Sequence, residues 1–249
     1  SVVGSALGNC AHAVLAVSGG LDSMVLLSAA ARLPARARRN VVVATFDHGT
    51  GKAAGRAAAM VARQASRLGF LCVTGRAATI GTREEEWRRG RWDFLRQVAA
   101  KRDSCVVTAH TLDDQIETVF MRILRDAGPR GLAGLYAESE IVRPFLDISH
   151  RTIANSAELH RVVFVQDPSN YDRKHLRNRI RLDILPSIVK RNPVSPDELL
   201  SVAGSAAAMP RSPEELAGHV GLAGGRGGGR GLPRAGAAGT DRRRARRRW

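Results

Sequence analysis

The stretch that decides the fold is Val14-Leu15-Ala16-Val17-Ser18-Gly19-Gly20-Leu21-Asp22-Ser23. Its apolar start predicts a strand, its two glycines predict a tight loop, and the residues from Ser23 onward show a helical pattern. Glycines at such a turn let the backbone approach an anion closely. The first turn of the following helix offers free amide groups and the positive end of the helix dipole. Residues 18–23 are therefore predicted to form a phosphate-binding loop.

Asp22 is an unusual neighbour for phosphate, because a carboxylate repels an anion. Its position is explained if a Mg²⁺ ion bridges it to the phosphates. The structural alternative is a glycine turn in which Asp22 and Ser23 only cap a helix. The loop does not follow the GxxxxGK[ST] or GxGxxG patterns. It resembles the PP-loop of ATP pyrophosphatases, which cleave ATP between the α and β phosphates and transfer AMP to an oxygen. The resemblance implies an adenylating activity.

Strand patterns and helical patterns alternate along the first half of the chain. The predicted strands are Ala13–Val17, Val41–Phe46, Leu71–Thr74 and Cys105–Ala109, and the predicted helices are Ser23–Leu33, Lys52–Leu68, Glu84–Lys101 and Asp113–Arg125. This alternation predicts an α/β fold with a parallel sheet and helices on both faces. Ligands of such sheets bind beyond the carboxyl ends of the strands.

Three regions are expected along the chain. Residues 1–148 are expected to form the ATP-binding catalytic domain. Residues 149–200 are expected to form a helical extension that completes the substrate site, with helices over Ser149–Leu159 and Arg177–Val189. Residues 201–249 are expected to be a Gly- and Arg-rich, low-complexity tail that is disordered, because its sequence cannot bury apolar surface.

The composition points to a polyanionic partner and a cytoplasmic location. The net charge is +16, and half of it comes from the nine Arg and one Asp between Arg226 and Trp249. The remaining excess favours a partner such as RNA. No apolar run approaches the ~20 residues of a membrane span. The three cysteines Cys10, Cys72 and Cys105 lack CxxC spacing. We therefore expect reduced thiols, with Cys105 in the core, rather than a zinc or iron–sulfur site.

Polar residues also follow the second predicted strand. Asp47 and His48 come directly after it. Because the carboxyl ends of parallel strands meet at one edge, both residues are expected to contact ATP beside the phosphate loop. A solvated turn is the alternative interpretation.

A richer polar cluster follows the fourth predicted strand, in Thr108-Ala109-His110-Thr111-Leu112-Asp113-Asp114-Gln115-Ile116-Glu117-Thr118. If the helical turn includes residue 110, then His110, Asp114 and Glu117 share one face. The opposite face is predicted to be buried, and consists of Ile116, Val119, Phe120 and Ile123. Carboxylates there suit Mg²⁺ or an ammonium group, and His110 suits acid–base chemistry or phosphate binding. The alternative is an acidic first turn that only complements the helix dipole.

Further motifs resemble the tRNA(Ile)-lysidine synthase family. They are the Thr108–Thr118 stretch, Gly131-Leu132-Ala133-Gly134-Leu135, Arg143-Pro144-Phe145-Leu146, Asp167-Pro168-Ser169-Asn170, and Arg177-Asn178-Arg179-Ile180-Arg181 with Leu185-Pro186. Their order and spacing match the catalytic domain of that family from about residue 11 to residue 192. The resemblance implies a ligase that forms a carbon–nitrogen bond. Such an enzyme adenylates the C2 carbonyl oxygen of the wobble cytidine of tRNA(Ile) with anticodon CAU, and the ε-amine of L-lysine then displaces AMP to give lysidine.

The resemblance also implies roles for individual residues. Residues 18–23 would hold ATP, and Asp22, His110 and Asp114 would be catalytic, with Asp22 and Asp114 as candidate Mg²⁺ ligands. Asp114 and Glu117 would face lysine, and Arg177 or Arg179 would meet its carboxylate, which suits a guanidinium fork. Arg88 and Arg91 would contact phosphate or tRNA, the alternative being a solvated helix face.

The resemblance weakens after Asn192-Pro193. There the family continues with amphipathic helices that help to hold tRNA, whereas this chain continues with the Gly/Arg tail. Two other functions therefore stay open. One is another PP-loop enzyme that modifies tRNA, such as a thiolase, although thiolases of cytidine typically need paired cysteines. The other is a truncated nucleotide- or RNA-binding protein without catalysis.

Overall fold

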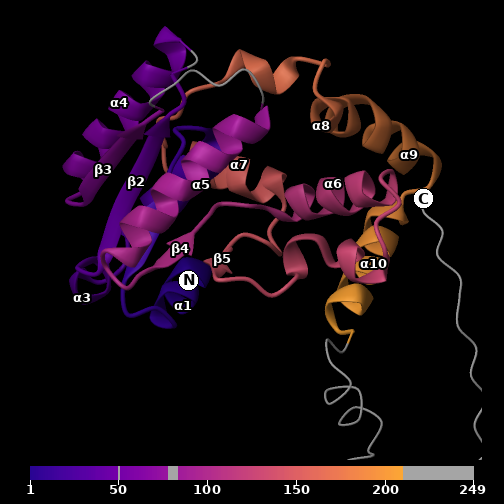
Figure 1. Cartoon of the computed structure of the whole chain (residues 1–249), viewed down its shortest axis with the longest axis horizontal. Helices are drawn as coiled ribbons and strands as arrows, with labels where there is room; N and C mark the ends of the chain where they lie inside the picture. Colours follow the sequence, from indigo (N-terminus) through magenta and orange to yellow (C-terminus); the bar gives the residue numbers. More distant parts are fainter. Residues whose placement is uncertain (50, 78–83, 210–249) are drawn as a thin grey trace, which may run out of the picture. The chain divides into compact units, whose positions relative to one another are not determined.

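The computed structural model describes residues 1–49, 51–77 and 84–209. These residues contain a sheet of five parallel strands in the order β3-β2-β1-β4-β5 (Figure 1). The strands are β1 (Ala13–Ala16), β2 (Val41–Asp47), β3 (Leu71–Arg76), β4 (Cys105–Val107) and β5 (Ile141–Val142). The predicted parallel sheet is confirmed. Strand β5 was not predicted, because two residues are too few to show a period.

Helices connect the strands and continue beyond them. They are α1 (Val2–Gly8), α2 (Leu21–Ala31), α3 (Ala35–Arg38), α4 (Lys52–Arg67), α5 (Glu84–Ala100), α6 (Leu112–Ile123), η1 (Pro129–Tyr136), α7 (His150–Leu159), η2 (Pro168–Tyr171), α8 (Leu176–Arg179), the π-helical turn η3 (Ile180–Ile184), α9 (Leu185–Arg191) and α10 (Ser195–Ala207). The single helix predicted over residues 177–189 is thus interrupted by a π-helical turn.

Helix α10 corrects the expected start of the tail. The predicted boundary at residue 200 falls inside this helix, whose Ala203 and Ala206 are buried. Small alanines allow α10 to pack closely against η1 and α6. Packed structure therefore extends at least to Ala207, and the rest of the predicted tail, from residue 210 onward, lies outside the described residues.

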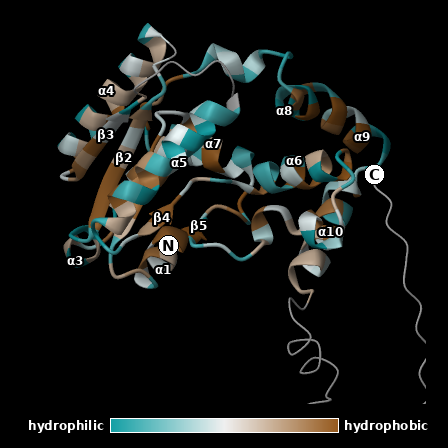
Figure 2. Cartoon of the chain, viewed as in Figure 1, coloured by the Kyte–Doolittle hydropathy of each residue, from teal (hydrophilic) through white to brown (hydrophobic). Residues whose placement is uncertain are grey.

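Helices cover both faces of the sheet, as predicted. Alternate side chains of β1 point to opposite faces: Leu15 joins a core with α1, α2, α4 and α7, whereas Val14 joins a second core with α5. Figure 2 shows β2 coloured mainly as hydrophobic and α5 mainly as hydrophilic, which fits a buried strand under an amphipathic helix. Burial on both faces explains why the central strands are runs of Val, Leu and Ala.

The motif around Gly134 is held by a buried glutamine of α6. Gln115 is fully buried, and its Nε2 donates to the Ala133 carbonyl at 2.9 Å while its Oε1 accepts from the Leu135 amide at 2.6 Å. Gly134 lies between these two contacts with φ +61° and ψ −127°, a backbone conformation that favours glycine. A Cβ at this position would lie 2.6 Å from Gln115 Oε1. The Gly131–Leu135 motif and Gln115 therefore form one structural unit.

Gly134→Ala is expected to lower the free energy of unfolding by about 1–3 kcal/mol, because the methyl group collides with Gln115 and the backbone is strained. Chemical denaturation measures the effect. Gly128→Ala is the matched control, since a Cβ there meets nothing within 4 Å. Equal stability of the two variants would contradict the close packing of Gly134 against Gln115.

The cysteines differ from the prediction. Cys10 and Cys105 form a disulfide with Cα atoms 6.2 Å apart, and Cys72 is free. The pairing of β1 with β4 places Ala13 beside Cys105, which brings residue 10 within reach. The expectation of three reduced thiols, with Cys105 a simple core residue, is therefore wrong in this structure.

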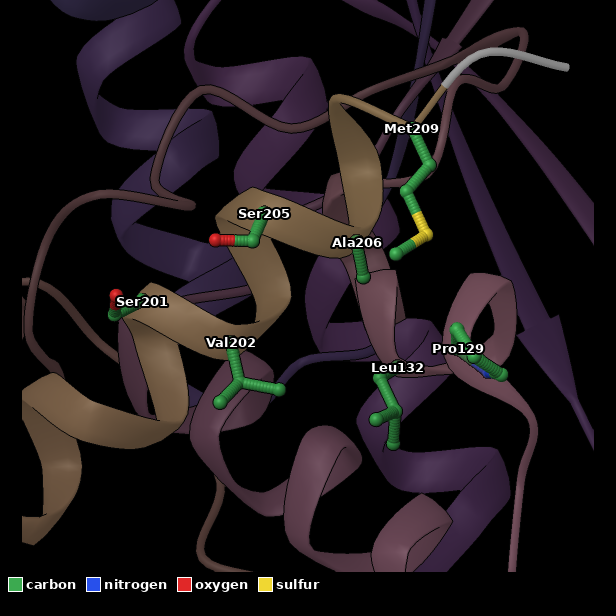
Figure 3. Close-up of a pocket in the computed structure, with 7 residues that line it drawn as sticks. All are labelled: Pro129, Leu132, Ser201, Val202, Ser205, Ala206 and Met209. Atoms are coloured by element: carbon green, nitrogen blue, oxygen red, sulfur yellow. The ribbon is translucent and has the colours of Figure 1, made fainter.

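A shallow apolar hollow lies between η1 and α10. Its volume is about 240 Å³, and Figure 3 shows Leu132, Val202 and Met209 beside it. None of the predicted site residues lines it. Among the described helices, none is both long and apolar enough to cross a bilayer.

Candidate active site

The phosphate loop has the geometry that an anion requires. Gly19 adopts φ +94°, and its carbonyl accepts a hydrogen bond from the Val165 amide at 2.9 Å. Ser23 Oγ accepts from the Ser18 amide at 3.2 Å and donates to the Gly20 carbonyl at 2.9 Å. The N-cap residue of α2 is Gly20, which has no side chain to cap the helix. The first amide groups of α2 are thereby left for a ligand, which fits triphosphate binding.

Asp22 contacts a histidine that the sequence did not point to. Its Oδ1 lies 2.9 Å from Nδ1 of His150, the first residue of α7. The backbone amide of His150 donates to Asp113 Oδ2 at 2.6 Å. The hydrogen bond with Asp22 raises the pKa of His150, against the opposing effect of burial. His150 therefore links the phosphate loop to the start of α6. Its isolated position after the Arg143–Leu146 motif gave no signal of this role.

The two residues after β2 have different environments. Asp47 is buried, and its Oδ1 accepts from the Gly49 amide at 2.9 Å, so it stabilises its own turn. His48 packs edge-on against Phe46, and its Nδ1 is buried without a hydrogen-bond partner in the part of the chain that the structure describes. Burial and then the charge of Arg91 lower the pKa of His48. A neutral histidine with an unpaired nitrogen is a better candidate ligand contact than Asp47.

His110 lies between β4 and α6 and is neutral at physiological pH. Its Nδ1 is 2.8 Å from Thr108 Oγ1, which fixes the orientation of the ring. Burial lowers the pKa of His110 to about 4, although nearby Asp114 raises it. A neutral imidazole cannot pair with phosphate as a cation, so the interpretation of His110 as a charged phosphate ligand is disfavoured. Its Nε2 remains for acid–base chemistry.

The low pKa of His110 gives a pH prediction. The folded state resists protonation until about pH 4, whereas an unfolded histidine takes up a proton near its ordinary pKa of 6.5. The stability associated with His110 is therefore present above pH 6.5 and decreases as pH falls from 6.5 towards 4. Nuclear magnetic resonance should show its imidazole titrating near pH 4, and His110→Asn should weaken the loss of thermal stability on acidification. Titration at or above pH 6.5 would contradict the assignment.

Helix α6 begins at Leu112, one residue before the predicted start at Asp113, and does not include residue 110. Its N-cap is Thr111, and a capping box joins the Thr111 and Asp114 side chains and backbone amides. His110 thus lies outside the helix instead of on its face. The predicted apolar face is also only partly correct, because Val119 is buried but Ile123 is exposed and Ile116 and Phe120 are half-buried. The tight packing is instead on the side of Gln115 and Glu117.

Asp114 and Glu117 are paired with two arginines. Arg177 donates from Nε to Glu117 Oε2 at 2.6 Å and from NH2 to Asp114 Oδ1 at 2.9 Å. Arg181 donates from Nε to Glu117 Oε1 at 2.5 Å and from NH2 to Glu117 Oε2 at 3.0 Å. We call these four residues the acid–arginine cluster. Burial alone would raise the pKa of Asp114, but Arg177 and the Thr111 amide hold it below its ordinary value.

The cluster contains Arg181 and not Arg179. Arg179 is exposed, whereas Arg177 and Arg181 are one helical turn apart and both reach Glu117. Of the two arginines predicted to meet lysine, the structure brings only Arg177 to the two acids. Helical spacing from Arg177 could have indicated Arg181, which belongs to the same sequence motif.

Arg91 is the more informative of the two arginines on α5. Arg88 is exposed, while Arg91 is half-buried. Burial and then the charge of Arg88 lower the pKa of Arg91. Arg91 also influences the pKa of both His48 and His110. The positive charge of Arg91 thus lies near the ends of β2 and β4, which fits an anionic ligand there. Arg88 fits the alternative interpretation, a solvated helix face.

The predicted Mg²⁺ ligands do not form a site by themselves. In the described ranges no three His, Cys, Asp or Glu side chains are grouped to hold a metal ion. The side chain of Asp22 is 32% exposed, while Asp114 accepts from Thr111 and Arg177. Mg²⁺ typically binds one or two carboxylates together with nucleotide phosphates and water. Asp22 therefore fits a magnesium–nucleotide complex, and Asp114 fits it poorly.

Comparisons with known proteins agree with this geometry. A family model described as a PP-loop domain matches residues 8–188. Similar curated proteins include the tRNA(Ile)-lysidine synthases of Methylobacterium nodulans, at 40% identity over 68% of this chain and 52% of the relative, and of Thermosipho africanus, at 34% identity over 73% and 44%. The tRNA(Ile)-lysidine synthase of Pectobacterium atrosepticum is 33% identical over 83% of this chain and 49% of its own length. The chain spans about half the length of these curated relatives.

Among solved structures, the U34-tRNA thiolase NcsA from Methanococcus maripaludis with its [4Fe-4S] cluster is similar in fold. It has a TM-score of 0.65 at 16% identity, with 84% of this chain and 78% of that chain covered. At this identity the likeness concerns the fold alone.

Proposed function

The chain belongs to the PP-loop domain family, and we propose that it ligates L-lysine to C2 of the wobble cytidine of tRNA(Ile) with anticodon CAU. Its similarity to tRNA(Ile)-lysidine synthases supports an ATP-using enzyme that modifies tRNA. The lysine substrate, the CAU anticodon, the adenylated intermediate and the cytoplasmic location belong to the proposal.

One observation supports the proposal most strongly: a continuous chain of contacts joins the phosphate loop to the acid–arginine cluster. Asp22 contacts His150, and His150 contacts Asp113. The next residue, Asp114, is the first acid of the cluster. An adenylated carbonyl and an amino acid must meet within one site for ligation, and these contacts link the candidate phosphate loop to the acids proposed to receive lysine.

The residues divide the proposed reaction between them. The α2 amides, Ser18 and Ser23 bind the phosphates, and Arg91 faces the same side of the sheet. Asp22 would hold Mg²⁺, which neutralises phosphate charge when bound. The cytidine O2 attacks the α phosphate and pyrophosphate leaves.

In the second step the lysine amine forms a bond to C2 while the bond from C2 to the oxygen of AMP breaks. The amine must lose a proton in this step. His110 would accept it at Nε2, in the tautomer whose Nδ1–H donates to Thr108 Oγ1. Adenylation converts the carbonyl oxygen into a good leaving group, which explains why ATP is needed.

The cysteines disfavour the thiolase alternative. The chain has three cysteines, and Cys10, which precedes β1, is paired with Cys105 at the start of β4. Cys72 lies on β3, so these thiols do not gather as cluster ligands do. The non-catalytic alternative is disfavoured by the intact phosphate loop and acid–arginine cluster.

AMP formation distinguishes the three functions. The proposal predicts that AMP accumulates only when ATP, L-lysine and tRNA(Ile) with anticodon CAU are all present at steady state. A tRNA with a different wobble base is the matched control. AMP that appears with a sulfur donor and without lysine would support a thiolase, and nucleotide binding without AMP would support the non-catalytic protein.

A further inference from the structure

The acids that should receive lysine are already occupied by the protein itself. The side chain of Glu117 is only 2% exposed, and both of its oxygens accept from arginines. Asp114 Oδ2 accepts from the amide and hydroxyl of Thr111, and its Oδ1 accepts from Arg177. An ammonium group therefore cannot reach Glu117 unless one guanidinium leaves.

The contacts indicate which guanidinium leaves. Arg177 bridges both acids at 2.6 and 2.9 Å and also reaches the Asp114 carbonyl at 3.4 Å. Arg181 binds Glu117 closely but meets Asp114 only at 3.5 Å, and its side chain is 43% exposed. It also lies in the π-helical turn η3, a type of irregularity that is frequent at functional sites. Arg181 thus makes the longer contact with Asp114, 3.5 Å against 2.9 Å for Arg177, and its side chain is the more exposed of the two, 43% against 35%.

We propose that Arg181 is a gate which occupies the ammonium subsite and is displaced by the ammonium group of the amino-acid substrate, while Arg177 stays in place. This inference rests on the proposed use of lysine. Because one cation replaces another beside Glu117, the charge of this nearly buried carboxylate stays neutralised throughout. It also favours substrates that carry an ammonium, because a neutral ligand would leave Glu117 underpaired.

The gate predicts that wild-type affinity for lysine is reduced by competition from Arg181. Apparent affinity falls in proportion to the fraction of molecules in which the subsite is free. Removing the competitor should therefore tighten binding, whereas removing a residue that binds the lysine carboxylate should weaken it. Replacement of Arg181 should therefore tighten lysine binding if Arg181 competes for the subsite, and weaken it if Arg181 binds the lysine carboxylate.

The test compares the stabilisation by L-lysine of the wild type and Arg181→Met, with ATP and Mg²⁺ present, by thermal unfolding over a range of lysine concentrations. Methionine keeps much of the apolar stem and removes the charge. The gate predicts an apparent Kd for lysine about tenfold lower in the variant, equivalent to about 1.4 kcal/mol. Arg173→Met is the matched control, because Arg173 pairs with Asp183 on the exposed side of the same segment. It should leave the lysine affinity unchanged.

Weaker or unchanged lysine binding by Arg181→Met would overturn the gate and leave the proposed function standing. If lysine stabilises neither protein although ATP stabilises both, the proposed use of lysine fails and the gate fails with it. Should Arg181→Met not fold, Arg181→Gln decides, because its neutral amide can still donate to Glu117 but carries no charge to compete with an ammonium group. Tighter lysine binding by that variant supports the gate, and equal or weaker binding overturns it.

Discussion

Replacing Asp22 with Asn is expected to reduce lysine- and tRNA-dependent AMP formation by roughly 100- to 1,000-fold. The amide keeps an oxygen that accepts from His150, so the position of the loop should persist. It loses the negative charge that would hold Mg²⁺ against the phosphates. The fold should therefore survive while the transfer of AMP fails. Initial rates of AMP release and circular dichroism measure the two properties separately.

Asp93→Asn is the control for Asp22→Asn. Asp93 forms an exposed ion pair with Arg96 on α5. Its replacement should change AMP formation by less than about twofold, because exposed ion pairs contribute little. If Asp22→Asn behaved like this control, or if it unfolded the protein without a specific loss of activity, Asp22 would be a helix-capping residue only.

Glu117→Gln is expected to raise the apparent KM for lysine by roughly 100-fold while changing the KM for ATP by less than about threefold. The amide keeps the shape of the side chain but cannot neutralise an ammonium group. It also leaves Arg177 and Arg181 with one acid between them, so the free energy of unfolding should fall by roughly 1–3 kcal/mol. Steady-state kinetics with each substrate varied in turn separates the binding effect from the loss of stability.

Glu158→Gln serves as the control for this variant. Glu158 is an exposed acid on α7. Its replacement should leave both KM values unchanged. Equal increases of the two KM values in Glu117→Gln would show that Glu117 supports the whole site instead of binding lysine, and would contradict the lysine assignment.

The sequence predicted the sheet well because its signals are local. A Val/Leu/Ala strand buried on both faces, followed by a Gly-Gly loop and a helix, can be recognised without knowledge of distant residues. The phosphate loop, Asp22 and the acids after β4 lie where the predicted sheet edge placed them. Short elements such as β5 carried too little pattern to be predicted.

The missed features all depend on contacts between distant residues. His150 lies 128 residues from Asp22, and no local pattern connects the two. The cap by Thr111, which excludes His110 from α6, depends on a choice of helix start that the sequence left open. The choice of Arg181 over Arg179 required the course of α8 and η3 relative to α6. The disulfide required the register of β1 against β4.

Transfer of labelled L-lysine to tRNA tests the central claim most directly. The protein is incubated with ATP, Mg²⁺, labelled lysine and a tRNA(Ile) transcript with anticodon CAU, and the nucleosides are then separated. We predict one lysine per tRNA on the wobble cytidine, one AMP released for each lysine transferred, and roughly 100- to 1,000-fold slower transfer by Asp22→Asn. Release of AMP without label on the tRNA, or label on a tRNA whose wobble base is not cytidine, would contradict the account.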